Sequence, residues 1–370
     1  MSENKTPLEQ LTVEGFKSIQ SLQDFKLTNL NVLIGGNGAG KSNFIELFRM
    51  ISSMMRVGGL KEFIQSNADA YLFGGIKQTP KIHIKMLFGQ NGYEFELAPT
   101  EDGFFLINAE KRHYLQRNTT KDLGNGHFDP QLLKDKDLEG YNYSHNASWY
   151  TYNAICNWQP YHFHDTSILA GMRRYQDVGH NEKLFFDASN IAPFLFYLNQ
   201  QHIECYRNII ETIRLVIPFF DDFILRPNQQ EQIRLNWRQK GLNDYPMRPS
   251  QLSDGAMRFI CLTTALLQPN SPSTIIIDEP ELGLHPYAIG ILAELFQAAS
   301  EKMQVIISTQ SPALVDYFDA KDVIIVNRLH GASEFKRLNP DELTHWLEDY
   351  SLGELWHKNI ISGHPSHELY

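Results

Sequence analysis

The chain has 370 residues, of which 42% are hydrophobic and 21% are charged, and its formal net charge is -10. This composition is typical of a globular protein with one or two hydrophobic cores, and it excludes a chain that is disordered throughout. The acidic balance, with no run of Lys and Arg longer than two residues, argues against a protein that coats nucleic acid by bulk charge.

Cysteine usage and hydropathy indicate the compartment. Cys156, Cys205 and Cys261 show neither paired nor metal-ligand spacing, so we expect no disulfide framework and no zinc site. The start MSENKTPLEQ is polar, and no window approaches 18 consecutive apolar residues, so we expect neither a signal peptide nor a membrane span. We therefore expect a cytoplasmic protein with no membrane partner.

The first predicted elements are two strands and a helix. In LTVEGFKSI, Leu11 and Val13 alternate with polar residues, which indicates a half-buried strand. The segment LNVLIGGNGAGKSNFIELFRMISSMM begins as an apolar strand over 30–34, crosses a glycine-rich loop and continues with apolar residues at helical spacing. Within it Gly35, Gly40, Lys41 and Ser42 satisfy the pattern G-x-x-x-x-G-K-[ST] in the strand-to-helix context that the pattern requires.

This loop has the chemistry of a phosphate site. Glycines let backbone N–H groups turn inward around a phosphate, and the following helix presents its positive end to the same anion. Lys41 is suited to reach the β- and γ-phosphates and the Ser42 hydroxyl to ligate Mg²⁺. We expect the Lys41 side chain to face solvent in the nucleotide-free chain. The context disfavours the alternative, a glycine-rich turn with an exposed lysine. The predicted nucleotide-binding residues of the loop are Gly35, Asn37, Gly38, Ala39, Gly40, Lys41, Ser42 and Asn43.

A long insertion follows. IHIKMLF and YEFELA alternate apolar and polar residues on either side of GQNG, which predicts a β-hairpin with an Asn-Gly turn and an antiparallel lobe. Residues 113–150 are polar and rich in turn formers, so we expect a loop or flexible insertion with a solvated DKD at 135–137. His162 and His164 could ligate a metal from a strand, but no third ligand has a recognisable spacing, so packing is favoured.

Helices are predicted next, at NIAPFLFYLNQ and ECYRNIIETIRLVIP, where apolar residues recur at core spacing. Several arginines could line a groove or meet phosphate, although solvated or ion-paired side chains are the favoured interpretation. They are Arg173, Arg174, Arg226, Arg238, Arg248 and Arg258.

The stretch PSQLSDGAMRFICLTTALLQP predicts the start of a buried helix. Ser253 or Asp254 can cap it by accepting a hydrogen bond from the first turn. The capping box is incomplete, because Ala256 and Met257 stand where Glu or Gln would be needed. Taken alone, this stretch favours a plain helix start over a ligand site.

The stretch STIIIDEPELGLHP carries the acidic residues of the predicted site. Three consecutive isoleucines are typical of a strand buried on both faces of a parallel sheet, which delivers its last residues to the ligand edge. Asp278 is suited to coordinate Mg²⁺ and Glu279 to act as general base on the attacking water, although an acidic turn before Pro280 is the simpler alternative. A third buried strand, QVIISTQ, ends at Gln310.

The order of these motifs resembles the ABC-type ATPase head of the SMC and RecF-like group. LSDGAMRF, IDEPELGLHP, STQSPALVD and WLEDYSLGELW further resemble compact bacterial predicted ATPases of the AAA-21/AAA-15 class. The resemblance implies an α/β P-loop NTPase fold, with a mostly parallel core sheet, an antiparallel β lobe and a helical insertion. No sustained heptad suggests the long coiled coil that SMC-like relatives often carry in the insertion.

The resemblance also assigns roles to residues. It implies that Ser253 and Gly255, in the signature motif, face the γ-phosphate bound by a second subunit. It places the segment Glu281 to Pro286 as the D-loop across a dimer interface. Gln310 stands where many relatives have a histidine, and its amide can donate to phosphate but cannot titrate, so we expect slow turnover. The expected catalytic residues are Glu279, Lys41 and Gln310.

From the resemblance we expect one ATPase head in four segments. These are N-terminal strands and loop helix over 1–60, the β lobe over 61–165, a helical subdomain over 166–248, and signature, acidic strand, D-loop, switch strand and tail over 249–370. The expected cofactors are ATP and Mg²⁺, and the expected assembly is a homodimer or higher oligomer.

The expected function is an ATP-driven dimerising switch for an effector protein from the same operon, or for DNA engagement, in bacterial antiviral defence or DNA repair. Two alternatives stay open. One is a nucleotide-sensing scaffold that does not hydrolyse ATP. The other is the ATPase subunit of a nuclease of the overcoming-lysogenisation type, whose catalytic domain would have to lie on another chain, because about sixty residues without D-x-D follow Gln310.

Overall fold

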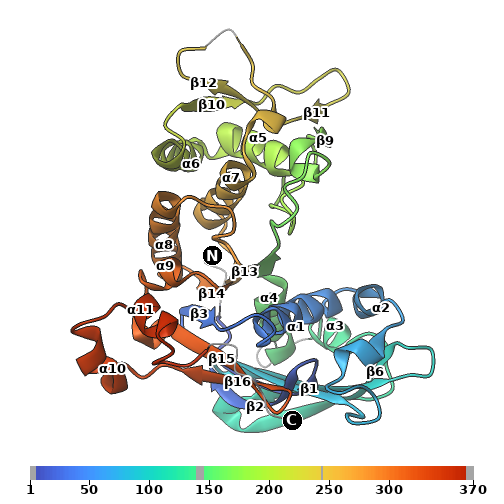
Figure 1. Cartoon of the computed structure of the whole chain (residues 1–370). Coiled ribbons are helices and arrows are strands. Elements are labelled where there is room, and N and C mark those ends of the chain that lie inside the picture. Colours follow the sequence, from blue (N-terminus) through green and yellow to red (C-terminus); the bar gives the residue numbers. More distant parts are fainter. Residues whose placement is uncertain (1–5, 139–145, 243–244, 364–370) are drawn as a thin grey trace.

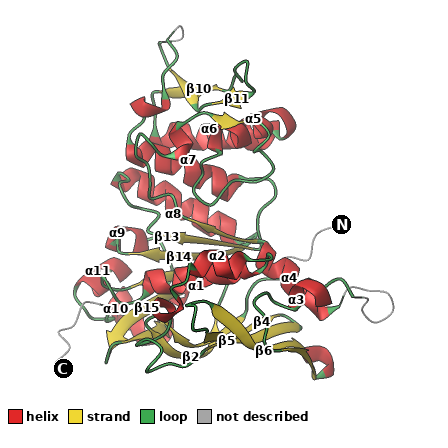
Figure 2. Ribbon diagram, turned by 90° about the vertical axis from the view of Figure 1, so that its right-hand side faces the viewer, coloured by secondary structure: helices red, strands yellow, loops and turns green. Residues whose placement is uncertain are grey.

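The computed structural model describes residues 6–138, 146–242 and 245–363. Two six-stranded sheets form a broad lobe, and a stack of helices rises from it as an arm (Figure 1). In the view of Figure 2, α1 (Lys41–Met54) lies between the two sheets. The structure is therefore layered, with the loop helix at its centre.

The first sheet is mostly parallel and confirms the predicted core sheet. Its order is β16-β15-β3-β14-β13-β8, and only the edge strand β16 runs antiparallel to its neighbour. The carboxyl ends of its parallel strands meet at one edge, where ligands bind in such sheets. The strands are β3 (Leu30–Ile34), β8 (Trp158–Tyr161), β13 (Thr274–Asp278), β14 (Gln304–Thr309), β15 (Val323–Leu329) and β16 (Ala332–Arg337).

Both faces of this sheet are buried, as the isoleucine run predicted. Ile275 and Ile277 join one hydrophobic cluster with the helical arm, whereas Ile276 joins a second cluster with α1. All three side chains are at most 2% exposed. Full burial of an Ile side chain contributes roughly 1.5–3 kcal/mol, so these alternating contacts tie the two layers firmly to the sheet.

The second sheet is antiparallel, with the order β2-β1-β4-β5-β6-β7. It contains the predicted hairpin, but the Asn-Gly turn is wrong: Phe88 pairs with Asn91, so Gly89 and Gln90 form the loop, and Gly89 supplies a left-handed φ of +56°. This register pairs Ile82 with Leu97, whereas an Asn-Gly turn would leave Ile82 beyond the end of β5. The strands are β1 (Gln10–Phe16), β2 (Ile19–Lys26), β4 (Ile82–Phe88), β5 (Asn91–Pro99), β6 (Phe105–Tyr114) and β7 (Thr119–Gly124).

The polar stretch 113–150 is more ordered than predicted. It contains β7, α3 (Leu132–Asp135) and the start of α4 (Ala147–Cys156), while residues 139–145 lie outside the described part. Asp135 of the DKD stretch is not solvated: it is buried, forms ion pairs with Arg112 at 2.9 Å and Lys121 at 2.5 Å, and accepts a hydrogen bond from Ser148. Polar composition misled the prediction because these partners lie on other elements.

The helical arm packs on the far side of the parallel sheet and contains the helices expected there. Its helices are α5 (Ile191–Gln201), α6 (Ile203–Val216), α7 (Asp254–Leu267) and α8 (Pro286–Ser300), and its short strands are β9 (Gln176–Asp177), β10 (Phe220–Ile224), β11 (Gln232–Ile233) and β12 (Asn236–Gln239). Shorter helices elsewhere are α2 (Gly59–Ile64), α9 (Pro312–Val315), α10 (Pro340–Leu347) and α11 (Leu352–His357). Among the described residues, no helix has the length and apolar character needed to span a membrane. The four-segment division stays a prediction.

Candidate nucleotide-binding site

The glycine-rich loop joins the end of β3 to the start of α1 at the ligand edge of the parallel sheet. Gly40 has a φ of +114°, and a Cβ atom there would lie 2.0 Å from Ser333 Oγ and 2.7 Å from Ser18 Oγ. Only glycine fits this position, because the backbone is left-handed and its far side is closely packed. Ser333 and Ser18 therefore pack against one side of the loop, and the opposite side stays exposed to a ligand.

Sequence reasoning missed the residues that support the loop. Ser333 Oγ lies 2.6 Å from the Ala39 carbonyl oxygen and 2.7 Å from Ser18 Oγ, and it is almost fully buried. Asn43, predicted to bind nucleotide, donates its amide to Ser18 Oγ at 2.7 Å. Asn43 therefore anchors α1 to the turn between β1 and β2. No local pattern marks Ser333, since it lies 294 residues from Ala39.

Lys41 does not face solvent, contrary to the prediction. Its side chain is buried, and Nζ donates to the carbonyl oxygens of Gly35 at 2.6 Å and Gly36 at 3.1 Å. Burial lowers the pKa of Lys41, an effect that Glu279, Asp278 and Glu281 oppose. The loop carbonyls and the acidic strand end thus hold the ammonium group in place. Of the other predicted loop residues, Asn37, Gly38 and Ser42 are exposed, whereas Gly35 and Ala39 are buried.

The two acidic residues stand at the end of β13, as predicted, and the structure shows that the neighbouring strand is β14. Asp278 accepts a hydrogen bond from the Ser308 hydroxyl. Glu279 has a left-handed φ of +46°, and its backbone N–H donates to the Ser308 carbonyl at 2.9 Å. A non-glycine residue in this conformation is uncommon and is held by its surroundings. The turn directs the Glu279 side chain toward the end of β14.

The structure brings Glu279 and Gln310 together. The side-chain amide of Gln310 donates to Glu279 Oε1. The two residues were predicted separately, one as general base and one in place of a switch histidine, and 31 positions separate them. Their contact supports a shared task at the ligand edge.

Glu281 is a site residue whose role was missed beyond its place in the D-loop. Its Oε1 accepts from the Thr309 hydroxyl at 2.6 Å and from the Gln310 backbone N–H at 3.1 Å. Burial raises its pKa, and the hydrogen bonds from Thr309 and Gln310 oppose that rise. The sequence signal was its position two residues after Glu279, without any indication of its partner.

The signature stretch begins α7, and Ser253 is the N-cap. Its side chain accepts from the backbone N–H of Ala256 at 3.2 Å. Gly255 packs against the D-loop of the same chain, because a Cβ atom there would lie 2.2 Å from the Gly283 carbonyl oxygen. Ser253 also lines a pocket of about 360 Å³ with Thr166, Ile168, Arg173, Ser250, Leu252 and Asp254. No residue of the glycine-rich loop lines this pocket.

Two of the candidate arginines connect the signature to its surroundings instead of being solvated. Arg173 is buried, forms an ion pair with Asp254 at 2.9 Å and donates to the carbonyls of Thr166, Pro249 and Leu252. Arg258, on α7, donates to the carbonyls of Phe163, His164 and Leu282. The favoured interpretation was therefore wrong for Arg258, whose described contacts are all to backbone, and right for the ion pair of Arg173.

The loop after β8 links the two regions. The His162 and His164 rings stack at 4.3 Å, and His164 Nε2 lies 3.0 Å from the Asp278 carbonyl oxygen. No group of three or more potential metal ligands of the His, Cys, Asp and Glu types occurs within residues 6–138, 146–242 and 245–363. The contact between the two rings is a packing contact, and this loop runs from Asp278 at the acidic strand end to Arg173, which pairs with Asp254.

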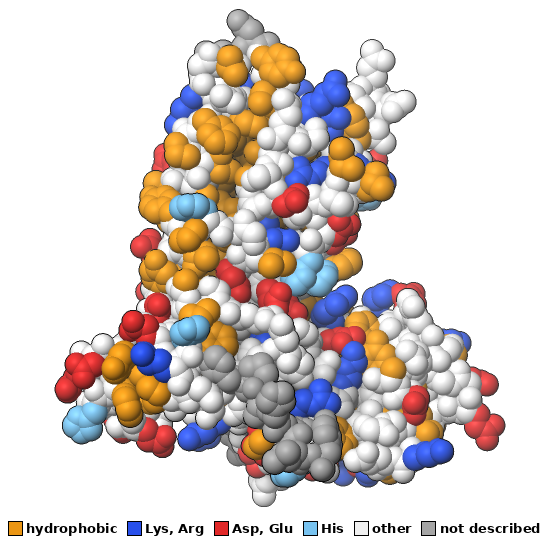
Figure 3. Space-filling model, viewed as in Figure 1, with side chains coloured by type: hydrophobic (Ala, Val, Ile, Leu, Met, Phe, Trp, Pro, Cys, Tyr) orange, Lys and Arg blue, Asp and Glu red, His pale blue; other side chains and the backbone are white. Residues whose placement is uncertain are grey.

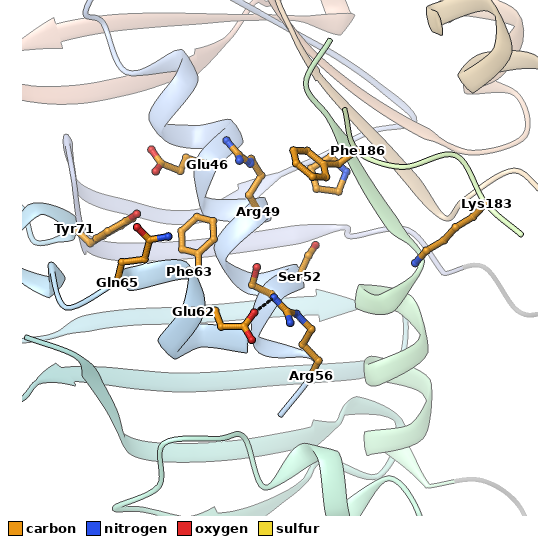
Figure 4. A pocket seen from close by; sticks show the side chains of 12 residues that line it. Glu46, Arg49, Ser52, Arg56, Glu62, Phe63, Gln65, Tyr71, Lys183 and Phe186 are labelled. Atoms are coloured by element: carbon orange, nitrogen blue, oxygen red, sulfur yellow. Dashed lines mark ion pairs between the residues drawn. The ribbon is translucent and has the colours of Figure 1, made fainter. Parts of the chain in front are cut away.

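A groove of about 1010 Å³ runs along the outer face of α1. Arg49 on α1 and Phe186 on the segment before α5 point into it (Figure 4), and basic side chains gather where the arm meets the lobe (Figure 3). Arg56 pairs with Glu62 at 2.5 Å. Within the described residues, the charged groups of the Arg49 and Lys183 side chains form no ion pair or hydrogen bond, although the Lys183 carbonyl accepts from the Asn190 side chain at 2.8 Å. The groove is lined by Glu46, Arg49, Ser52, Ser53, Arg56, Glu62, Phe63, Gln65, Tyr71, Pro160, Lys183 and Phe186.

Comparisons with known proteins agree with this geometry. Residues 30–82 and 121–316 match the family model AAA_21, described as "AAA domain, putative AbiEii toxin, Type IV TA system". No curated protein matches the sequence. The fold is similar to that of an SMC head bound to the C-winged helix domain of ScpA, with 16% identity, a TM-score of 0.54 and coverage of 92% of this chain and 99% of that chain. It is also similar to an SMC head with an extended coiled coil bound to the C-terminal domain of ScpA, derived from Pyrococcus furiosus, with 14% identity, a TM-score of 0.52 and coverage of 93% and 99%.

Proposed function

We propose that this chain, which belongs to the AAA_21 family, binds ATP, hydrolyses it slowly and dimerises on it as a switch for a partner protein or for DNA. The observation that carries the proposal is the division of the site. The glycine-rich loop, Asp278, Glu279 and Gln310 gather at one sheet edge, whereas Ser253 lines a separate pocket. Each chain then contributes its sheet edge to one ATP site and its Ser253 pocket to a second ATP site, and each site is completed by the other chain.

The residues at the sheet edge suit phosphoryl transfer to water. Lys41 neutralises the β- and γ-phosphates once it leaves the loop carbonyls, and the backbone N–H groups of the loop hold the same anion. Glu279 takes the proton of the attacking water, and Gln310 orients that water or donates to the γ-phosphate. The hydroxyl of Ser42 and the carboxylate of Asp278 are hard oxygen donors that fit Mg²⁺, which when bound neutralises charge on the phosphates.

Turnover is expected to be slow because Gln310 cannot carry charge. A neutral amide stabilises the developing phosphate charge less than a protonated histidine would. The family description names a putative toxin of a toxin–antitoxin system, which supports a setting in bacterial defence. The SMC heads of similar fold bind ScpA, which supports a protein effector, for example from the same operon.

The test of hydrolysis is Glu279→Gln. The variant should retain ATP and Mg²⁺ but lose turnover by at least about 100-fold, because an amide cannot accept the water proton. Steady-state phosphate release and ATP binding measured on the same preparation give both quantities. Equal turnover in wild type and variant would show that Glu279 is not the base. A wild type that binds ATP without turnover would favour the sensing scaffold, and nuclease activity only with a second chain would favour the nuclease subunit.

The groove along α1 favours DNA as a second partner. Arg49 and Lys183 are cations without a partner among the described side chains, and Phe63, Tyr71 and Phe186 add aromatic surface. Phosphate contacts by such cations release counterions and make binding dependent on salt. We propose that an anionic DNA backbone lies in this groove.

The double substitution Arg49→Ala, Lys183→Ala tests this groove. Affinity for a short DNA duplex should fall, and the slope of log affinity against log salt should decrease in magnitude by about 2, because two phosphate contacts are lost. Fluorescence anisotropy over a salt series measures both. Lys302→Ala removes an exposed cation elsewhere, after the end of α8, and serves as control. A double variant that binds DNA with the wild-type slope would exclude the groove as the DNA site.

A further inference from the structure

Gln310 lies between two carboxylates, and each carboxylate contacts a different part of it. The side-chain amide donates to Glu279 Oε1, and the backbone N–H donates to Glu281 Oε1 at 3.1 Å. The same Glu281 oxygen accepts the Thr309 hydroxyl at 2.6 Å, and Thr309 Oγ1 accepts from the Ser311 backbone N–H at 3.0 Å. Glu281 thereby binds Thr309 and Gln310 directly, and through Thr309 it is linked to Ser311 in the turn at the end of β14.

Gln310 and Glu281, the two residues of this contact, differ in how many other contacts fix their positions. Gln310 is exposed, and it donates hydrogen bonds to the two glutamates, from its backbone N–H to Glu281 and from its side-chain amide to Glu279. Glu281 belongs to a fixed loop: Leu282 accepts a hydrogen bond from Arg258 through its carbonyl, and the Gly283 carbonyl lies against Gly255. The fixed residue therefore positions the exposed one.

The second carboxylate oxygen of Glu281 makes the arrangement unusual. Oε2 is buried and has no hydrogen-bond partner within the described residues. Keeping a carboxylate oxygen buried and unpaired costs free energy, so a residue that served only to end a strand would be better replaced by a neutral one. A functional requirement for the Oε1 acceptor of Glu281 at this position would explain why the protein keeps a carboxylate despite the free-energy cost of burying Oε2.

We propose that Glu281 is a positioning residue for hydrolysis: it fixes the backbone of Gln310 so that the Gln310 amide reaches Glu279. The proposal rests on the proposed ATPase function. It assigns Glu281 its main effect on the chemical step, through Gln310, and only a small effect on ATP binding, through the charge of Lys41.

A double-mutant cycle tests the proposal. Glu281→Ala and Gln310→Ala should each lower kcat about tenfold, with KM for ATP changed less than about twofold, and the double variant should be no slower than the slower single variant. Glu281→Gln keeps an Oε1 acceptor for Thr309 and Gln310, so it should recover kcat to within about threefold of wild type. If Glu281→Ala fails to fold, Thr309→Val, which removes one donor to Glu281, takes its place in the cycle. Losses that multiply in the double variant, or a Gln310→Ala protein with wild-type kcat, would overturn the proposal.

Hydrogen exchange separates this proposal from the proposed function. In the nucleotide-free protein, the Gln310 backbone amide should exchange at least about tenfold faster in Glu281→Ala than in wild type, because its acceptor is gone. This measurement does not require turnover. A wild type without ATPase activity would overturn the proposed function, while lost protection in the variant would still support the holding contact. Unchanged protection would overturn the positioning role.

Discussion

The Lys41 side chain is buried within the glycine-rich loop and donates hydrogen bonds to the carbonyl oxygens of that loop. Its partners are the carbonyl oxygens of Gly35 and Gly36, and the carboxylates of the acidic strand end lie near enough to affect its pKa. Burial opposes the charged form and the carboxylates favour it. To contact phosphate, Nζ must exchange two carbonyl acceptors for anionic oxygens, and charged hydrogen bonds of this kind contribute about 1.5–3 kcal/mol each.

Lys41→Ala should therefore remove nearly all ATP binding. We expect at least about a 100-fold loss of affinity, because phosphate loses its only lysine contact in the loop. We also expect a fall in the free energy of unfolding of about 1–2 kcal/mol, because neighbouring carboxylates lose a buried cation. Titration with a fluorescent ATP analogue and thermal unfolding measure the two effects. Wild-type affinity in the variant would show that the loop binds no phosphate, and Lys302→Ala should change neither quantity.

At the residue scale, motifs predicted the site but not its support. Lys41, Asp278 and Glu279 followed from local patterns, because strand-loop-helix spacing and a strand end fix their surroundings. Ser333 and the contact between Glu281 and Gln310 did not, because they join residues 294 and 29 positions apart. Lys41 was placed in solvent because its acceptors are carbonyls, which carry no sequence signal.

At the scale of elements, the decisive junction joins α7 to the D-loop. Arg258 donates from α7 to the Leu282 carbonyl, and Gly255 lets the first turn of α7 approach the Gly283 carbonyl. The same loop carries Glu281, which holds the end of β14. A shift of this loop would therefore move the signature and Gln310 together.

Gly255→Ala tests this junction, because close packing and helix propensity predict changes of opposite sign in the free energy of unfolding. Replacing a helical glycine by alanine ordinarily stabilises a helix by roughly 0.5–1 kcal/mol. Here the new Cβ would lie 2.2 Å from a carbonyl oxygen, so we expect a loss of about 1–3 kcal/mol instead. Denaturant unfolding measures the sign, and ATPase assays should show lower kcat as the D-loop is displaced. A stabilised variant would contradict the close packing, and Ala256→Gly, in the same turn, controls for the intrinsic cost of glycine.

Elements with strong periodicity were predictable, and the connections between them were not. The hairpin of β4 and β5 and the helices α5 and α6 follow from apolar spacing. The hairpin turn was misplaced because two turns fit the same alternation, and pairing along the whole strand selects between them. The stretch 113–150 was misjudged because its order depends on ion pairs between distant elements, such as Asp135 with Arg112.

At the scale of the whole molecule, the sheet edge and the signature pocket are separate parts of one chain. The edge gathers Lys41, Glu279 and Gln310, and the pocket is lined by Ser253 with residues from other segments. The loop from His164 to Arg173 connects them, with one end on Asp278 and the other on Asp254. Two chains related by a two-fold axis could bring each edge to the other chain's pocket, and both sites would then close together.

Ser253→Arg tests this assembly. The edge of the same chain is untouched, so ATP binding by the monomer should stay near the wild-type value. ATP-dependent association and turnover should be lost, because the longer side chain fills the space for the γ-phosphate. Ser253→Thr keeps a hydroxyl cap and should lose far less. Mixing Ser253→Arg with Lys41→Ala in equal amounts should restore up to about half of the wild-type rate, because neither variant forms an ATP-dependent dimer with itself and each mixed dimer has one intact site of two. Light scattering and ATPase assays measure both effects. If Ser253→Arg dimerises and hydrolyses ATP like wild type, Ser253 serves only as the N-cap of α7, and the two-chain site is wrong.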